Sequence, residues 1–118
     1  MTFEAFASAV RTYCALTGGS VTSWGRTPWH NHVVGGVAQS AHQYWLAADA
    51  RQWEHYSAAE RIRVREWAAT VQVVDVAAQP PVWATSRSHR SAVAERLGLR
   101  VIFEDDHEHL QPADWKAG

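Results

Sequence analysis

The stretch SAHQYWLAAD, residues 40–49, decides how this chain can fold around a functional site. It places His42 and Asp49 seven positions apart, with the bulky Tyr44 and Trp45 between them. Seven residues of straight helix separate Cα atoms by about 10 Å, and seven of straight strand by about 23 Å on opposite faces. Both are too far for two ligands of one metal ion, each of which would lie about 2 Å from it. The stretch is therefore either a strand with polar ends, or a bend after which Asp49 returns toward His42.

The residues on either side of this stretch predict strands and a long loop. GRTPWHNHVVGGVAQSAH (25–42) contains three Gly and one Pro, and long loops in compact domains are usually functional. We expect a strand at 20–24 before this loop and a buried strand at 46–50 after it. Apolar residues at i, i+3 and i+4 predict an amphipathic helix over about 3–16, which Gly18 and Gly19 end.

The second half of the chain alternates helices and strands without a regular βαβ order. Ser57 and Glu60 form a capping box that begins a helix, whose apolar stripe comprises Val64, Trp67, Ala68, Val71 and Val74. After Pro80 and Pro81, VWATS (82–86) predicts a strand, 88–97 a short helix ending at Gly98, and 99–104 and 107–111 two further strands. We therefore expect a single α+β domain over residues 1–118.

Composition excludes several classes of protein. With 11 basic and 12 acidic residues and a net charge of −1, the chain lacks the basic surface of a nucleic-acid binder or a polybasic membrane anchor. Cys14 is the only cysteine, so we expect no intrachain disulfide, folding in a reducing compartment and a buried, inert thiol. The first residues, MTFEAFASAV, lack a basic region and predict no signal peptide. No apolar run approaches the roughly 20 residues of a membrane span.

A second cluster of histidines and carboxylates lies at EDDHEHLQ, residues 104–111. On a strand, His107 and His109 would point to one face and Asp106 and Glu108 to the other. Taken alone, this cluster also fits a solvated edge of a sheet. Catalytic zinc typically takes three protein ligands and one water, and a nearby carboxylate accepts the proton of that water. The clusters at 42–49 and 104–111 together supply all of these groups.

Four short motifs occur in an order that is typical of one family. Ser40, His42, Ala47 and Asp49 match the pattern S-x-H-x-x-G-x-A-x-D, with Trp45 in place of its Gly. Upstream stand Arg26, PWHN (28–31) and VGG (34–36), and downstream LGL (97–99) precedes an acid-x-x-His motif at 106–109. In these motifs, over about residues 20–50 and 97–112, the chain resembles the zinc D-Ala-D-Ala carboxypeptidases and L-alanyl-D-glutamate endopeptidases. These peptidoglycan peptidases share a fold with the hedgehog signalling domain.

The resemblance implies a fold and a set of roles. The fold would be a small antiparallel sheet with helices packed on one side. The implied roles are zinc binding by His42, Asp49 and His109, general base catalysis by Asp106, pairing with a substrate carboxylate by Arg26, hydrogen bonding by Ser40 and oxyanion stabilisation by His107. Planar Arg suits carboxylate recognition, and donors placed near a developing oxyanion stabilise it.

Several alternatives to these roles stay open. Glu104 competes with His107 for the oxyanion, and Glu104-x-x-His107 also spells acid-x-x-His. His30 and His32 are alternative metal ligands, Arg26 fits an ordinary surface residue and Ser40 a turn cap. The remaining residues considered are Trp24, Trp29 and Trp45, which suit either core packing or a substrate groove, and His55 and His89, which we expect to be exposed near helix starts without a role.

The leading hypothesis is a zinc metallopeptidase that cleaves the peptidoglycan stem peptide. Family members include phage endolysins, which fold in the cytosol without a signal peptide. The resemblance thus implies a monomer made in the cytoplasm that reaches the cell wall after release or within a virion, with no nucleic-acid partner and no membrane insertion. The alternative is an inactive or altered zinc-binding or cell-wall-binding module of the same fold. Trp45 motivates that alternative, because a bulky residue at the bend could fill the cleft and does not easily adopt the positive φ of a Gly.

Overall fold

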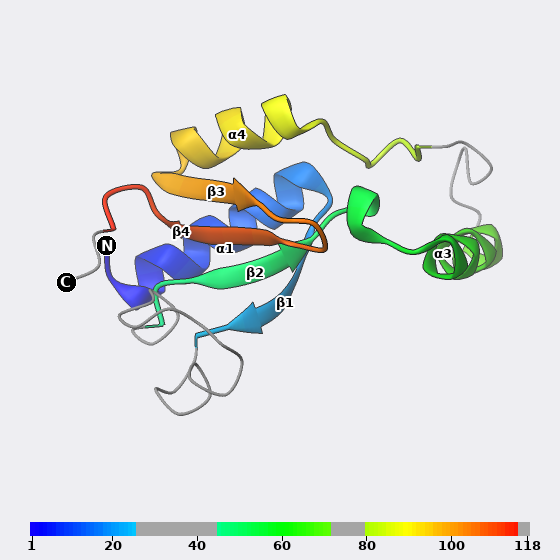
Figure 1. The fold of residues 1–118 in the computed structure, drawn as a ribbon, viewed down its shortest axis with the longest axis horizontal. Coiled ribbons are helices and arrows are strands. Elements are labelled where there is room, and N and C mark those ends of the chain that lie inside the picture. Colours follow the sequence, from blue (N-terminus) through cyan, green and yellow to red (C-terminus); the bar gives the residue numbers. More distant parts are fainter. Residues whose placement is uncertain (26–44, 72–79, 116–118) are drawn as a thin grey trace.

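A four-stranded antiparallel sheet forms the centre of the molecule (Figure 1). The computed structural model describes residues 1–25, 45–71 and 80–115. The strands are β1 (Ser20–Trp24), β2 (Ala48–Arg51), β3 (Leu99–Phe103) and β4 (Glu108–Pro112), in the spatial order β1-β2-β4-β3. The helices of the described part are α1 (Phe3–Thr17), α3 (Ala58–Thr70), α4 (Arg87–Arg96) and the short 3-10 helix η2 (Trp53–His55). The predicted α+β class is confirmed.

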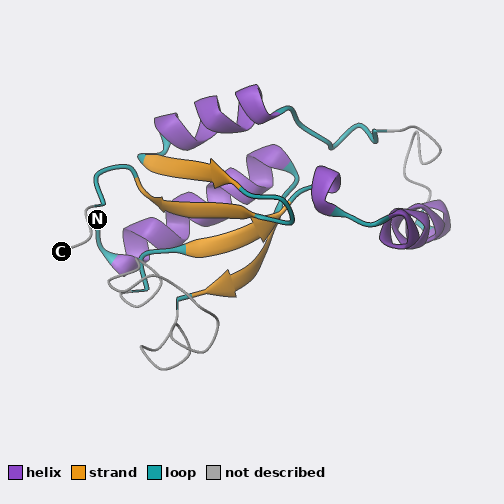
Figure 2. Ribbon diagram, viewed as in Figure 1, coloured by secondary structure: helices purple, strands orange, loops and turns teal. Residues whose placement is uncertain are grey.

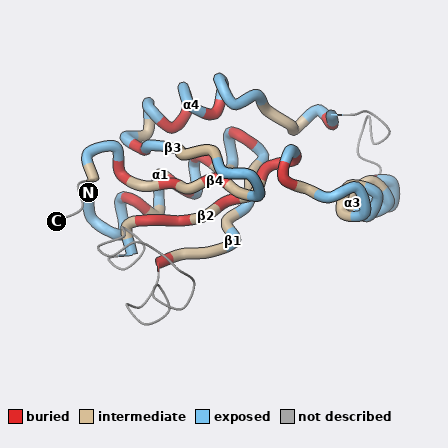
Figure 3. Tube along the Cα trace, viewed as in Figure 1, coloured by how far each residue is buried: buried red, intermediate tan, exposed pale blue. Residues whose placement is uncertain are grey.

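Helices α1 and α4 pack on one face of the sheet, as Figure 2 shows. Their buried residues form one core with alternate residues of the strands, and Figure 3 shows buried residues along α1, β2 and β4. The core comprises Phe6, Val10, Tyr13, Ala48, Ala50, Val93, Ala94, Leu99 and Leu110. Because side chains alternate along a strand, the residues between these core positions point to the opposite face. We call that opposite face, with Asp49, Arg51, His109 and Gln111, the distal face.

Local sequence signals place α1 as predicted. The Thr2 hydroxyl accepts a hydrogen bond from the Ala5 amide at 3.1 Å and caps the helix start. Gly18 ends the helix in the left-handed conformation, with φ of 78°, which a residue without Cβ adopts at little cost. The helix runs one residue beyond the predicted end, because the Gly18 amide still donates to the Cys14 carbonyl at 2.9 Å. Prediction and structure therefore differ here only in the last residue.

The strands at 20–24, 99–104 and 107–111 are confirmed within one residue at each end, and the helix at 88–97 begins and ends one residue earlier than predicted. The strand predicted at 46–50 begins instead at Ala48 and continues to Arg51. Trp45, with φ of 60°, turns the chain, and the Ala47 carbonyl accepts a hydrogen bond from the Gly25 amide at 3.1 Å. The ladder to β1 starts at Ala48, opposite Trp24. The bend thus shortens the strand at its beginning.

The prediction of a strand at VWATS, residues 82–86, is wrong. The Ala84 amide donates to the Pro81 carbonyl at 3.0 Å, which closes a turn. The Thr85 hydroxyl then donates to the Thr17 carbonyl at 2.8 Å, and Ser86 caps α4. These contacts fix the segment as a turn that leads into α4. The apolar run at 82–86 is so short that its pattern fits a turn as well as a strand.

The helix that begins after Ser57 is confirmed, but its apolar stripe is not a core face. The capping box is present, with Ser57 Oγ accepting from the Glu60 amide at 3.1 Å. In the described part of the helix only Ala68 is buried, while the Trp67 side chain is 60% exposed. Polar contacts hold the helix instead, because Arg51 binds Glu60 and the Arg61 guanidinium lies over the Trp53 ring. Val74, the last residue of the predicted stripe, falls outside the described residues.

One carboxylate lies inside the core. Glu108 is fully buried on the inward face of β4. It accepts hydrogen bonds from the Tyr13 hydroxyl at 2.7 Å and from Gln52 Nε2 at 3.2 Å, and it pairs with the buried Arg90. These partners come from α1, from the residue before η2 and from α4. Since a buried charge is tolerated only when it is paired and hydrogen-bonded, Glu108 ties three elements to the sheet.

No helix among residues 1–25, 45–71 and 80–115 is long and apolar enough to span a membrane.

Candidate metal-binding site

Asp49 and His109 lie side by side on the distal face of the sheet. They are directly opposite each other in the antiparallel pairing of β2 with β4. Asp49 Oδ1 is 3.7 Å from His109 Nδ1, and both side chains are mostly buried, with exposed fractions of 14% and 15%. Both alternate with inward-facing core residues, so the strand period places them on one face. The structure therefore brings together one predicted ligand from each of the two clusters.

His107 approaches the same carboxylate from the residue before β4. Its Nε2 is also 3.7 Å from Asp49 Oδ1, so both histidines approach one oxygen, as expected if they share a face. Glu108 points to the opposite face, also as expected. Asp106 departs from the expectation, because it lies in the turn before the strand and hydrogen-bonds His107 Nδ1 at 2.7 Å. The chain thus places Asp106 beside His107 and not on the core face with Glu108.

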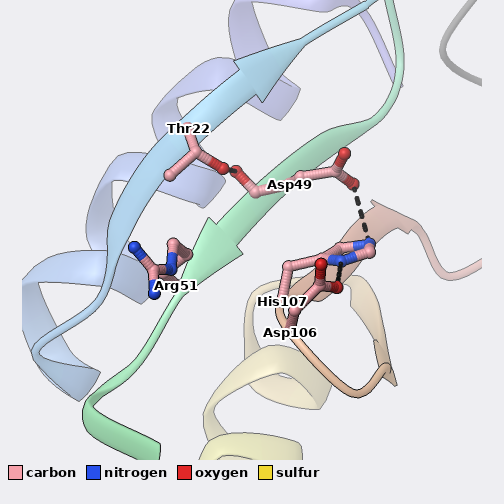
Figure 4. Close-up of a pocket in the computed structure, with 5 residues that line it drawn as sticks. All are labelled: Thr22, Asp49, Arg51, Asp106 and His107. Carbon is pink, nitrogen blue, oxygen red and sulfur yellow. Dashed lines mark hydrogen bonds and ion pairs between the residues drawn. The ribbon is translucent and has the colours of Figure 1, made fainter. Parts of the chain in front are cut away.

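These groups line a pocket on the distal face (Figure 4). Its described lining consists of Thr22, Asp49, Arg51, Asp106 and His107. The Thr22 hydroxyl donates to the Asp49 main-chain carbonyl at 3.3 Å, at the irregular register between β1 and β2. Glu104 was the alternative to His107 at the oxyanion and to Asp106 as the acid of the acid-x-x-His motif. It is exposed and is not among the described residues that line this pocket. The pocket therefore combines two carboxylates with an imidazole, a hydroxyl and a guanidinium.

Arg51 is held in the pocket wall by an ion pair. Its two terminal nitrogens bind the two Glu60 oxygens at 2.7 and 2.9 Å, and one of them also donates to the His55 carbonyl at 2.8 Å. The Tyr56 ring lies under the guanidinium, 5.0 Å away. The hydrogen bonds from Arg51 lower the pKa of Glu60 to about 2. This arrangement occupies the planar fork of Arg51 and pairs its charge with that of Glu60.

The carboxylate of Asp106 is in the form that a general base requires. The hydrogen bond with His107, followed by the charge of that imidazole, lowers the pKa of Asp106. Asp106 is therefore ionised at neutral pH. Its side chain is 87% exposed, so water has direct access to it.

The donor types and spacing at Asp49 and His109 fit two corners of a zinc site. Two ligands at about 2.0–2.1 Å from a tetrahedral ion lie roughly 3.3 Å apart, and the observed oxygen–nitrogen distance is 3.7 Å. Among residues 1–25, 45–71 and 80–115, no group of three His, Cys, Asp or Glu side chains is arranged to hold a metal ion. His42, the third ligand that the resemblance implies, lies outside the described residues, as do Arg26, Ser40, His30, His32 and Trp29.

Trp45 takes the backbone conformation that Gly usually supplies. Its φ is 60°, in the left-handed region that side chains with Cβ rarely adopt. Its indole lies against Gly25, where an added Cβ would come within 2.4 Å of ring atoms. Trp45 is not among the described residues that line the pocket. Trp24, in contrast, packs edge-on against Phe3 and Phe6 and belongs to the core side of the sheet.

Other sequence-based expectations have mixed outcomes. His89 is exposed at the start of α4, as expected. The prediction that His55 is exposed is wrong, because this residue is buried and its Nδ1 accepts a hydrogen bond from the Gln52 amide at 2.9 Å. Burial lowers the pKa of His55, so this acceptor role is consistent with a neutral ring. Cys14 is partly buried, and burial raises its pKa to about 11, which fits an unreactive thiol.

Three residues near the site were not anticipated from the sequence. Arg51 and Gln111 each follow a predicted ligand by two positions on the same strand, so the strand period could have placed them on the same face. Thr22 lies at a bulge between Val21 and Ser23 in the pairing with β2, and no sequence signal marks that bulge. Its place in the pocket could be found only from the structure.

The described lining of this pocket supplies two carboxylates, an imidazole, a hydroxyl and a guanidinium, and His109 lies beside it, 3.7 Å from Asp49 Oδ1. No family model, no curated protein and no solved structure matches this chain.

Proposed function

We propose that this chain is a zinc-dependent peptidase that hydrolyses a peptide bond in the stem peptide of bacterial peptidoglycan. It would act as a D-Ala-D-Ala carboxypeptidase or as an endopeptidase, on a hedgehog-like fold. The observation that carries the proposal is the pairing of Asp49 with His109 across two neighbouring strands, 3.7 Å apart. Each comes from a different one of the four motifs on which the family resemblance rests. The ionised Asp106 beside the same pocket supports it further.

The proposed zinc ligands are His42, Asp49 and His109. Zinc, when bound, supplies a Lewis acid for the scissile carbonyl and lowers the pKa of its water to about 7. Asp106 accepts the proton of the attacking water, since it is an exposed carboxylate on the pocket wall. His107 holds Asp106 in place through its 2.7 Å hydrogen bond.

His107 has a second role only in one protonation form. In the neutral ring that donates its Nδ1–H to Asp106, Nε2 of His107 has only a lone pair. This form of His107 therefore cannot donate a hydrogen bond to an oxyanion. The doubly protonated ring can donate from Nε2, the nitrogen 3.7 Å from Asp49 Oδ1. We therefore assign oxyanion stabilisation to the imidazolium form of His107.

Substrate binding is proposed for Arg26 and Ser40. A stem peptide ends in a carboxylate, which a guanidinium fork binds through two parallel hydrogen bonds. The described arginine in the pocket, Arg51, already makes this bidentate pair with Glu60. That occupancy favours Arg26 for the substrate, with Ser40 contributing a hydrogen bond to substrate or to the ligands.

The position of Trp45 favours an enzyme over a non-catalytic zinc-binding or cell-wall-binding module of the same fold. Its ring packs on Gly25 and is not part of the described pocket lining. Its φ of 60° lies in the left-handed region that the Gly of the family pattern would adopt without strain. The proposed setting is a phage or prophage, where a monomeric enzyme acts on the cell wall after release or as part of a virion.

The test is to measure metal content and cell-wall cleavage on the same preparation. Protein purified without added metal is analysed for zinc by mass spectrometry, and purified sacculi are digested and their muropeptides identified by mass. We expect one zinc per chain and new stem-peptide termini that disappear after chelation and return with added zinc. One zinc without turnover would instead support the non-catalytic module, and absence of bound zinc would contradict both.

A further inference from the structure

Gln111 lies next to His109 on the distal face of β4. Two positions separate them along the strand, so their side chains point the same way. Gln111 Oε1 is 2.8 Å from His109 Nε2. Gln111 is only partly buried and stands opposite Arg100 of β3, outside the core cluster. The amide oxygen of Gln111 therefore contacts the His109 imidazole and not a group of the core.

With the Gln111 amide oriented so that Oε1 faces the imidazole, this contact indicates which nitrogen of His109 carries the proton. An amide oxygen only accepts hydrogen bonds, so in this orientation Nε2 is the donor and the protonated nitrogen of the neutral ring. Nδ1 then has the lone pair, and Nδ1 is the nitrogen that lies 3.7 Å from Asp49 Oδ1. A metal binds only an unprotonated ring nitrogen, and the hydrogen bond at the other nitrogen sets its orientation.

We propose that Gln111 is a positioning residue, which holds His109 in the Nε2–H tautomer with Nδ1 directed toward Asp49. The proposal rests on the proposed function for its use in zinc binding. Gln111 does not touch the ion or the substrate and acts only through His109. Partners of this kind typically change metal affinity by about 10- to 100-fold when they are removed.

A matched pair of variants isolates the acceptor oxygen. Gln111→Leu keeps a side chain of similar size and removes the acceptor, whereas Gln111→Glu keeps an acceptor at the same reach. Zinc affinity is measured by competition with a chromophoric chelator, and thermal melting checks that both variants fold. We expect zinc affinity to fall by about 10- to 100-fold in Gln111→Leu and to stay within a few-fold of wild type in Gln111→Glu.

A second readout does not depend on zinc. Long-range ¹H–¹⁵N spectra of the metal-free protein, with His109 assigned through His109→Gln, distinguish protonation at Nε2 from protonation at Nδ1. We expect Nε2–H in the wild type and in Gln111→Glu, and a mixture of tautomers in Gln111→Leu. Since Leu changes no charge at this position, an altered tautomer reports the lost acceptor and not a general change of the field.

The outcomes separate this proposal from the proposed function. An unchanged tautomer and unchanged zinc affinity in a folded Gln111→Leu would overturn the role of Gln111. Equal losses in the Leu and Glu variants would also overturn it, because they would report packing. Failure of the wild type to bind zinc would overturn the zinc site, while the tautomer spectra would still decide whether Gln111 sets the proton on His109.

Discussion

Asp49 Oδ1 lies 3.7 Å from His109 Nδ1, across the directly paired strands β2 and β4. The same oxygen lies 3.7 Å from His107 Nε2, so distance alone does not select one histidine as its partner. The second ring nitrogen has a different partner in each histidine. His109 Nε2 contacts the neutral amide of Gln111, whereas His107 Nδ1 contacts the exposed carboxylate of Asp106. His109 also lies within the strand, where the ladder fixes its backbone. Either partner suits a metal-ligating histidine, so the position in the ladder is what favours His109 as the proposed ligand, and it leads to the first prediction.

Replacing His109 by Ala should remove zinc, and replacing His107 by Ala should leave it bound. The reason is that His109 shares the rigid ladder with Asp49, whereas His107 stands before the strand. Zinc content after dialysis against a weak chelator measures the difference, with Asp49→Asn as a second variant expected to lose the metal. Retention in His109→Ala together with loss in His107→Ala would show that the acid-x-x-His motif is Glu104-x-x-His107.

Replacing Asp106 by Asn should abolish most turnover while zinc stays bound. Removing a general acid–base group typically costs about 10²- to 10⁴-fold in rate, and Asn keeps the size of the side chain. Asp105→Asn is the matched control, because it removes the same charge from the exposed neighbouring residue of the same turn. Muropeptide release per unit time is measured for both. Equal rates in the two variants would remove Asp106 from the reaction.

The sequence predicted the elements that carry the site, because their signals are local. The predicted capping box at Ser57 and Glu60 is present, and Gly18 and Gly98, predicted to end their helices, both have positive φ. The alternation of EHLQP predicted that His109 and Glu108 face opposite sides. The family resemblance implied that Asp49 and His109 lie close together, and the register of β2 with β4 places them directly opposite each other.

What could not be predicted depends on contacts between distant elements. Nothing in the sequence marks Glu108 as buried, because its partners Tyr13, Gln52 and Arg90 come from other segments. Helical periodicity assigned an apolar stripe to α3, but an Arg51–Glu60 ion pair contributes to holding that helix instead. A short apolar run at 82–86 fits a strand or a turn equally well until the Thr85 contact with Thr17 is known.

Trp45→Gly should be more stable than Trp45→Ala by about 1 kcal/mol. Both variants lose the indole contact with Gly25 and differ only in Cβ, which at a φ of 60° costs about 1–2 kcal/mol. Urea unfolding of the two variants gives the difference. Equal or greater stability of the Ala variant would show that residue 45 does not adopt the left-handed conformation.

Removing the buried carboxylate should destabilise the fold more than removing one of its hydrogen bonds. Glu108→Ala leaves Arg90, which is 1% exposed, without its core partner, and breaking a buried pair costs about 3–5 kcal/mol. Tyr13→Phe removes one hydrogen bond to a charged acceptor, worth about 1.5–3 kcal/mol. Guanidinium unfolding measures both free energies. A smaller loss in Glu108→Ala than in Tyr13→Phe would mean that the carboxylate is not paired as described.

Acid should selectively weaken the contact between Arg51 and Glu60. Hydrogen bonds from Arg51, followed by those involving Ser57, lower the pKa of folded Glu60 to about 2, against 4.5 for the unperturbed group. Because the folded pKa is depressed, the stabilisation is fully present above about pH 4.5. It is lost as the pH falls toward 2, where the folded carboxylate takes up its proton. The difference in melting temperature between wild type and Glu60→Gln should therefore be largest near neutral pH and vanish toward pH 2.

A double-mutant cycle with Arg51→Met assigns this pH dependence to its main cause. In the Arg51→Met background, Glu60→Gln should change the melting temperature less, and less steeply with pH, because only the contacts of Glu60 with Ser57 remain. Coupling between the two substitutions at pH 7 that shrinks as the pH falls measures the ion pair directly. Coupling that is constant from pH 7 to pH 2 would show that packing around Tyr56, and not charge, joins Arg51 to α3.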